Sequence, residues 1–243
     1  MRLDVFVRAV MLAVVILVPG CAGSLPIYKS MGGEESLEAI ARRQEALCSL
    51  SAECELELTD AAGREVKLDA VLVAQPPRRV RLRAWKLGRA VFDLTIADGR
   101  AWLFTPEDGL PAGAFQAQDV PARQLGDALS LLGPEYFRSA RLIDGDEMIL
   151  TVRGTLLGHP EVECRIDRRT LVPLLFAFGT ESGEESRELS LTDYRAFDRL
   201  VWPMRLQLRG PSGTVVLRFR EVELNGELAP GAFIPSARAS EIP

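Results

Sequence analysis

The side chains that could perform chemistry in this chain are few, and its single histidine restricts them further. In the segment HPEVEC, His159 shares a two-residue alternation with Glu161 and Glu163, and these are donor types that a divalent metal binds. Arg165 continues the same face, so the pattern favours the solvent side of a strand over a metal site. We therefore expect no metal ion and no cofactor.

A second candidate is the acidic pair Asp144 and Asp146 in the segment DGDE, residues 144–147. A general acid/base pair must line a cleft, whereas Asp and Gly at this spacing are typical of a hairpin turn. The sequence also lacks a glycine-rich phosphate loop, a GxSxG elbow and a CxxC pair. The prediction is a protein that is not an enzyme, and a hydrolase of envelope material that uses this turn is the rival.

The remaining side chain of chemical interest is Cys21, which follows the only long apolar run of the chain. Arg2 and Arg8 precede this run, which extends over residues 9–18, and Pro19-Gly20 follow it. Charged, apolar and small residues in this order are typical of a secretory signal. The run is also too short for a spanning helix, which needs roughly 20 apolar residues.

The residues Val18-Pro19-Gly20-Cys21 resemble the lipobox of bacterial lipoproteins, in which the cysteine becomes the lipidated first residue of the mature chain. Pro19 departs from that pattern, because a small or hydroxylated residue is more usual there. The resemblance implies that Cys21 is a lipid anchor, and ordinary secretion with an incidental cysteine is the alternative. We expect a lipoprotein signal peptide at residues 1–20, a tether at 21–33 and one domain at 34–243.

The charge of the mature chain argues against one class of partner. Removal of residues 1–20 takes away Arg2, Arg8 and Asp4 from 29 basic and 34 acidic residues, which leaves 27 and 33 and a net charge of −6. Phosphate binding needs clustered Lys and Arg, so we expect no nucleic acid partner.

Three cysteines remain beside the anchor, and their pairing stays open. Cys48 and Cys54 could close a short loop, or Cys54 could pair with Cys164 if their strands meet. The third alternative is that all three are small buried hydrophobic residues.

A two-residue alternation of apolar and polar side chains runs through most of the chain and predicts a long antiparallel meander. ECELEL, residues 53–58, shows it most clearly, and it recurs between turn signals for roughly ten or eleven strands. Helical spacing replaces it from Glu34 to Leu50. The alternation breaks again at 121–137, where Leu125, Leu129 and Leu132 share one side of a short amphipathic helix that Gly133-Pro134 ends. In the last strand the parity changes near Arg220 and Glu221, which predicts a bulge.

A sheet that is apolar on one face must curl around a cover, and a curved sheet can enclose a cavity. The candidate lining residues are large apolar side chains from the strands, and ordinary core packing is the alternative for each. They are Leu82, Phe92, Leu94, Trp102, Phe104, Met148, Trp202, Met204 and Phe219.

Four segments in this order are similar to the periplasmic lipoprotein carriers and receptors of the Lol pathway (LolA and LolB). They are the first helix with its alternating strand, PPRRVRLRAW with LTIADGRAWLF, LTDYRAFDRLVWPMRLQL, and the closing LNGELAPGAFIP. The resemblance implies an α+β fold: a curved, antiparallel, unclosed β-barrel of about eleven strands covered by two or three helices. It also implies an apolar cavity that receives the acyl chains of lipoproteins.

The function that follows from this resemblance is a membrane-anchored periplasmic protein that binds acyl chains and assists lipoprotein or lipid transfer. Because it has its own lipobox, the chain resembles the anchored receptor more than the soluble carrier, and Leu110 would be the apolar residue that contacts the membrane. Ala22 after the anchor favours the outer membrane. The alternative is an envelope scaffold or sensor with the same fold, a filled interior and no transfer activity.

Overall fold

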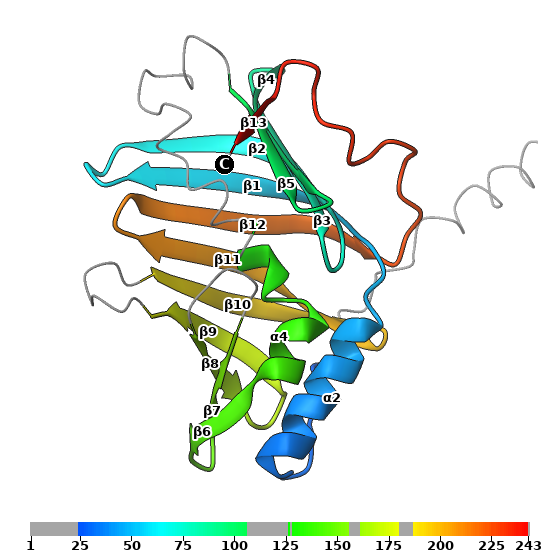
Figure 1. Ribbon diagram of the computed structural model, residues 1–243, viewed down its shortest axis with the longest axis vertical. Helices are drawn as coiled ribbons and strands as arrows, with labels where there is room; N and C mark the ends of the chain where they lie inside the picture. Colours follow the sequence, from blue (N-terminus) through cyan, green and yellow to red (C-terminus); the bar gives the residue numbers. More distant parts are fainter. Residues whose placement is uncertain (1–23, 106–125, 127, 156–160, 180–186, 243) are drawn as a thin grey trace, which may run out of the picture.

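The strands of this protein form one open antiparallel sheet, with helices against one of its faces (Figure 1). The computed structural model describes residues 24–105, 126, 128–155, 161–179 and 187–242. Along the sheet the strands lie in the order β13-β5-β4-β3-β2-β1-β12-β11-β10-β9-β8-β7-β6. Their bounds are β1 Leu50–Asp60, β2 Glu65–Gln75, β3 Arg79–Lys86, β4 Arg89–Ala97, β5 Arg100–Phe104, β6 Arg141–Gly145, β7 Ile149–Gly154, β8 Val162–Asp167, β9 Val172–Phe178, β10 Arg187–Phe197, β11 Leu200–Gly210, β12 Gly213–Leu224 and β13 Ser240–Ile242.

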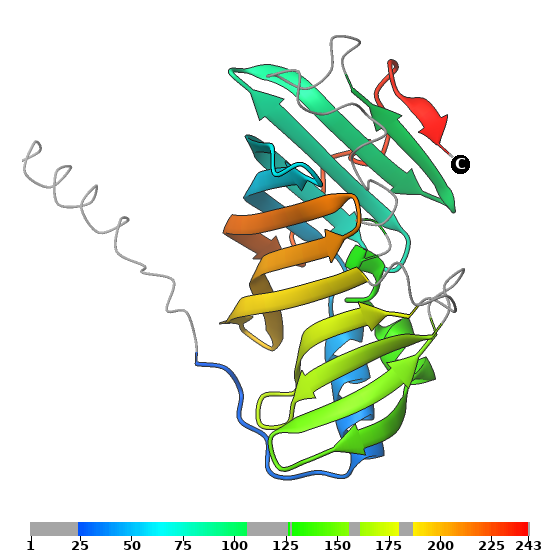
Figure 2. The same ribbon diagram turned by 90° about the vertical axis from the view of Figure 1, so that its left-hand side faces the viewer.

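The described residues contain thirteen strands, so the expectation of about eleven was too low. The two edge strands explain the difference. β13 is only three residues long, and all five residues of β6 are exposed, so neither carries the alternation that marks a half-buried strand. β6 also includes Asp144 and Gly145, which the sequence assigned to a hairpin turn. The predicted open, curved, antiparallel architecture is confirmed, and Figure 2 shows how strongly the sheet twists.

The predicted alternation places one row of each strand on an inner face that packs against the helices. In β1 the residues Cys54, Leu56 and Leu58 are buried, and Leu56 pairs with Leu68 of β2 and Leu217 of β12. Direct partners in an antiparallel pair share a face, so these rows join into a single apolar surface. This inner face is the largest part of the core.

The bulge predicted in the last strand is confirmed. Glu53 pairs with Glu221 and Cys54 pairs with Phe219, which leaves Arg220 as the extra residue of β12. An extra residue reverses the alternation, so Phe219 faces inward on one side of the bulge and Val222 packs against the core on the other.

The first predicted helix is α2, Gly33–Glu45, with Leu37, Ile40 and Ala41 in the core. Its C-terminal end is held to the end of β12 by Asn225. The side chain of Asn225 accepts a hydrogen bond from the N–H of Cys48 at 2.7 Å and donates one to the carbonyl of Ala46 at 2.8 Å.

The second predicted helix differs from its expected form. Residues 126 and 128–130 are helical, but Pro134 begins a further helix, α4 (Pro134–Ser139), where the sequence predicted that Gly133-Pro134 would end the helical region. Proline is favoured at the first position of a helix, because the N–H it lacks would have no partner there. Tyr136 of α4 is fully buried, its ring packs edge-on against Phe176 at 5.2 Å, and its hydroxyl donates to the carbonyl of Val162 at 2.8 Å.

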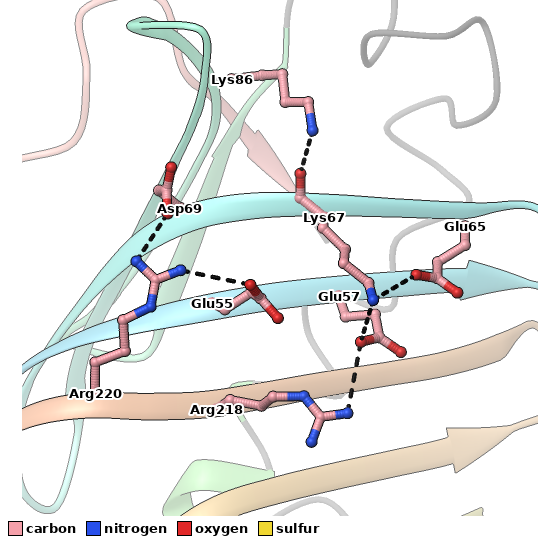
Figure 3. Close-up of polar contacts among 8 residues, drawn as sticks. All are labelled: Glu55, Glu57, Glu65, Lys67, Asp69, Lys86, Arg218 and Arg220. Atoms are coloured by element: carbon pink, nitrogen blue, oxygen red, sulfur yellow. Dashed lines mark hydrogen bonds and ion pairs between the residues drawn. The ribbon is translucent and has the colours of Figure 1, made fainter.

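The outer face of the sheet is polar, and acidic and basic side chains alternate across the central strands (Figure 3). Nη1 of Arg220 lies 3.0 Å from Oδ1 of Asp69, and its Nη2 lies 3.4 Å from Oε2 of Glu55. Nζ of Lys67 lies 3.5 Å from Oε2 of Glu57. Exposed pairs of this kind contribute little to stability, because solvent screens them. Because both signs are interspersed, this part of the outer face offers no site of a single charge.

Candidate functional site

Six of the nine candidate lining residues lie together in the core. Leu82, Phe92 and Leu94 are fully buried in β3 and β4. Trp202, Met204 and Phe219 are buried in the central strands β11 and β12, where the rings of Trp202 and Phe219 meet edge-on with centroids 6.1 Å apart.

Trp102 and Phe104 lie on the opposite face, which corrects their assignment to the inner lining. Trp102 pairs with Thr95 and Phe104 pairs with Asp93, whereas Leu103 between them pairs with the inward Leu94. Asp93 belongs to the outer face, where Oδ1 of Asp93 accepts a hydrogen bond from Nε of Arg81 at 2.9 Å. In the sequence WLF all three residues are apolar, so composition could not show which of them point inward.

Met148 is also separate from the inner group. It precedes β7 in the β6–β7 turn, and 55% of its surface is exposed. The sequence predicted Met148 as an inward lining residue, but β7 begins at Ile149, so Met148 lies outside the strand.

One small cavity lies between the inner face and segment 129–133. Leu50, Val80, Leu129 and Leu132 supply apolar walls, and Trp202 lines the cavity as well. The cavity volume is about 30 Å³. That volume holds a water molecule and is far too small for an acyl chain, so this part of the interior is closely packed.

The indole of Trp202 is the unusual group in this cavity. Trp202 is only 4% exposed, and its Nε1–H has no hydrogen-bond partner among the described residues. A buried donor without a partner costs about 1–3 kcal/mol, and buried tryptophan N–H groups usually find an acceptor. The sequence analysis selected Trp202 for its apolar surface and missed this donor, for which sequence carries no signal.

Helix α2 is attached to the β8–β9 turn by a buried arginine. Arg43 is 8% exposed, and its guanidinium donates to the carbonyls of Thr170 and Leu171 in the β8–β9 turn. Burial lowers the pKa of Arg43. Breaking these bonds would leave a buried charge with fewer partners, so α2 is firmly attached to this turn.

The acidic turn behaves as the hairpin interpretation predicts. The carboxylate of Asp146 accepts hydrogen bonds from the N–H groups of Met148 and Ile149, both at 2.7 Å, and these bonds lower the pKa of Asp146. Asp144 accepts from the N–H of Gly145 at 2.8 Å. Both carboxylates are exposed and stabilise the turn instead of lining a cleft.

The metal hypothesis gains no support from the part of the chain that the structure describes. No three His, Cys, Asp or Glu side chains within it are grouped to hold a metal ion. His159, Leu110 and Cys21 lie outside the described residues. Among the described helices none is long and apolar enough to cross a bilayer.

Comparison with known proteins shows the fold. No protein-family model matches the chain, and neither does any curated protein sequence. Among solved structures, an outer membrane lipoprotein-sorting protein domain from Vibrio parahaemolyticus superimposes with a TM-score of 0.60 at 13% identity, covering 83% of this chain and 96% of that one. A LolA superfamily protein from Nitrosomonas europaea gives 0.59 at 13% identity, with 84% and 97% covered.

The chain therefore has a LolA-like fold. A DUF1329 family protein from Desulfovibrio piger is similar to the same extent, with a TM-score of 0.61, 11% identity and coverage of 84% and 98%. The resemblance that the sequence suggested is confirmed at the level of the fold. At identities this low, the shared LolA-like fold does not assign a function to any individual residue of this chain.

The three described cysteines are all free, so neither predicted disulfide forms. Cys54 and Cys164 are buried, as the third alternative expected, but Cys48 is exposed. Burial raises the pKa of Cys54 to about 12 and also raises that of Cys164. Their thiols are therefore neutral apolar groups of the inner face.

We expect maleimide to label Cys48 in the native protein at roughly pH 8, and to label Cys54 and Cys164 only after unfolding. Peptide mapping by mass spectrometry checks this, with Cys48→Ser as the unlabelled control. Because the pKa of Cys54 is raised in the folded state, its contribution to the free energy of unfolding is complete below pH 9 and is lost as pH rises towards 12. Native labelling of Cys54 as fast as Cys48 would contradict this packing.

Proposed function

We propose that the inner face binds acyl chains and that the protein, anchored to a membrane through lipidated Cys21, assists lipoprotein or lipid transfer in the periplasm. The observation that carries the proposal is the N–H of Trp202, which has no hydrogen-bond partner among the described residues and lies beside a cavity lined mostly by apolar side chains. A ligand that combines a hydrocarbon chain with a carbonyl oxygen satisfies both features. The similar fold of a lipoprotein-sorting domain also supports the proposal that this chain binds acyl chains.

Binding of a chain requires the packed interior to open. Leu129 and Leu132 bring apolar side chains from segment 129–133 to the cavity, and they occupy the space that an acyl chain needs. When this segment moves away, the chain replaces those contacts at roughly 25 cal/mol per Å² of apolar area removed from water. Helix α2 stays in place during this exchange, because Arg43 and Asn225 both attach its C-terminal end to the sheet.

A second function is favoured by the size of the cavity. A cavity of only about 30 Å³ beside Trp202 fits an envelope scaffold or sensor that has the same fold and no transfer activity. The two functions differ in a measurable property, since only the first requires the protein to take up lipid.

The anchor places the protein in the cell envelope. Lipid on Cys21 holds the chain to a membrane through about 0.8 kcal/mol for each buried CH₂ group, and Ala22 favours the outer membrane, facing the periplasm. Leu110 stays a predicted membrane contact.

The role of the indole N–H is tested with two lipids of equal chain length, 1-palmitoylglycerol and its ether analogue 1-O-hexadecylglycerol, which lacks the carbonyl. We expect the protein to bind the ester on the order of tenfold more tightly, because only the ester has the carbonyl oxygen that accepts from Trp202. Trp202→Phe keeps an aromatic ring, removes the donor and should bind both lipids alike. Displacement of a fluorescent fatty acid gives the dissociation constants.

Met204→Leu is the matched control, since it alters a neighbouring buried side chain and keeps the donor. Equal affinity of the unaltered protein for the two lipids would remove the role of Trp202 and keep acyl binding. Binding of neither lipid would contradict acyl binding and favour the scaffold.

Lipidation of Cys21 is tested by expressing the full chain and its Cys21→Ser variant in bacteria. The unaltered protein should lose residues 1–20, gain the mass of its acyl chains and sediment with membranes. The Cys21→Ser variant should carry no lipid and leave the membrane fraction after a high-salt wash. Denatured-state mass spectrometry and fractionation give the result, and an unaltered protein without acyl mass would disprove the anchor.

A further inference from the structure

The short tether is attached to one particular edge of the sheet. The N–H of Tyr28 donates to the carbonyl of Arg169 in the β8–β9 turn at 2.8 Å, and Tyr28 and Met31 pack against the core. Six residues separate Cys21 from Tyr28. An extended chain spans at most ~3.3–3.6 Å per residue, so the anchor lies within about 25 Å of this turn. A membrane that holds Cys21 must therefore lie close to the same edge.

Exposed apolar side chains gather at this edge. Four of the six exposed large hydrophobic residues in the described part of the chain belong to the tether, β6 or the β6–β7 turn. The exposed fractions are 70% for Ile27, 55% for Met148, 44% for Leu142 and 39% for Ile143. Single exposed apolar residues are ordinary, but a group of four beside an anchor needs an explanation.

Two contacts show how these residues lie in space. The N–H of Arg168 donates to the carbonyl of Met148 at 2.9 Å, and Arg168 is next to Arg169, which holds Tyr28. A Cβ atom built on Gly33 would lie 2.7 Å from Cδ2 of Leu142, so β6 lies against the start of α2, where the tether ends. We name this edge, formed by Ile27, Leu142, Ile143, Met148 and the β8–β9 turn, the tether-side rim.

The charges of the rim are mixed. Lys29 and Arg169 are exposed there, and so are Asp144 and Glu147. The basic groups suit anionic headgroups, but no single sign dominates. Contact with a membrane would therefore rest on the anchor and the apolar side chains.

We infer that the tether-side rim rests on the membrane surface, with Ile27, Ile143 and Met148 in the interfacial layer. This inference rests on the proposed anchoring through Cys21 and goes beyond it, because an anchor alone leaves the orientation of the protein open. The strand register places Leu87, which is 95% exposed, at the other ends of the strands, near the β1–β2 and β11–β12 turns. In this orientation Leu87 points away from the membrane.

The proposed orientation also determines where the cavity lies relative to the membrane. Leu50 begins β1, Ala74 lies near the end of β2 and Val80 lies near the start of β3, and all three line the cavity beside Trp202. Through the antiparallel register these strand ends lie along the same edge of the sheet as the β8–β9 turn. Acyl chains that enter from the membrane would therefore meet the cavity end of the inner face first.

The test uses the full lipidated chain in a Cys48→Ser background, so that the buried Cys54 and Cys164 do not react. A fluorophore is attached to Met148→Cys at the rim, to Leu87→Cys, or to Ser212→Cys in the β11–β12 turn as the matched exposed control. Each protein is inserted into phosphatidylethanolamine and phosphatidylglycerol vesicles with or without a nitroxide-headgroup lipid.

We expect the nitroxide lipid to quench the label at position 148 several-fold more than the labels at 87 and 212. Equal quenching at the three positions, or stronger quenching at 87, would overturn the inference and leave the anchor intact. Failure of the lipidated protein to float with the vesicles would overturn both the anchoring and the rim. The same flotation assay on Cys21→Ser separates insertion of the anchor from contact by the rim.

Discussion

The constraint on which this structure depends is that a long antiparallel sheet with one apolar face must keep that face out of water. Thirteen strands in a single sheet expose far more apolar surface on their inner side than the two short described helices could cover on a flat layer. The sheet twists and curves around them, so that its own strands bury much of the surface. Open edges at β6 and β13 are the consequence, because the sheet curls without closing.

The cover of the inner face is of two kinds. Helix α2 is attached by polar groups that allow little movement, since Arg43 bonds to the β8–β9 turn and Asn225 joins the end of the helix to β12. Segment 129–133 covers the face near Trp202 by apolar contacts through Leu129 and Leu132. Apolar contacts can be exchanged for similar contacts with a hydrocarbon chain, whereas the buried hydrogen bond from Arg43 to the carbonyl of Leu171 cannot. The division between a fixed and an exchangeable cover is the physical basis of the proposed acyl binding.

Much of this fold follows from the two-residue alternation of apolar and polar side chains in the sequence and from the positions at which that alternation changes. The alternation in residues 53–58 predicted β1 and its inward face, and the change of parity near Arg220 predicted the bulge. The predictions that were wrong have a common cause. Where neighbouring residues are all apolar, or where a strand is very short, the residue types do not show which side chains point inward, and only the strand register decides it. Trp102 and Phe104 lie in a run of three apolar residues, and β6 and β13 have no buried row at all. Likewise, no sequence pattern distinguishes an indole N–H that has an acceptor from the one of Trp202, which has none among the described residues.

Acyl binding by the inner face is the central claim, and native mass spectrometry of full-length protein extracted gently from its expressing cells tests it most directly. The denatured mass of the same sample gives the chain with its covalent lipid, so the difference between the two masses reports lipid held without a covalent bond. The account predicts a native mass that is larger by a lipid-sized increment. Equal masses, even after incubation with excess 1-palmitoylglycerol or lipopeptide, would contradict it and leave the filled scaffold as the function.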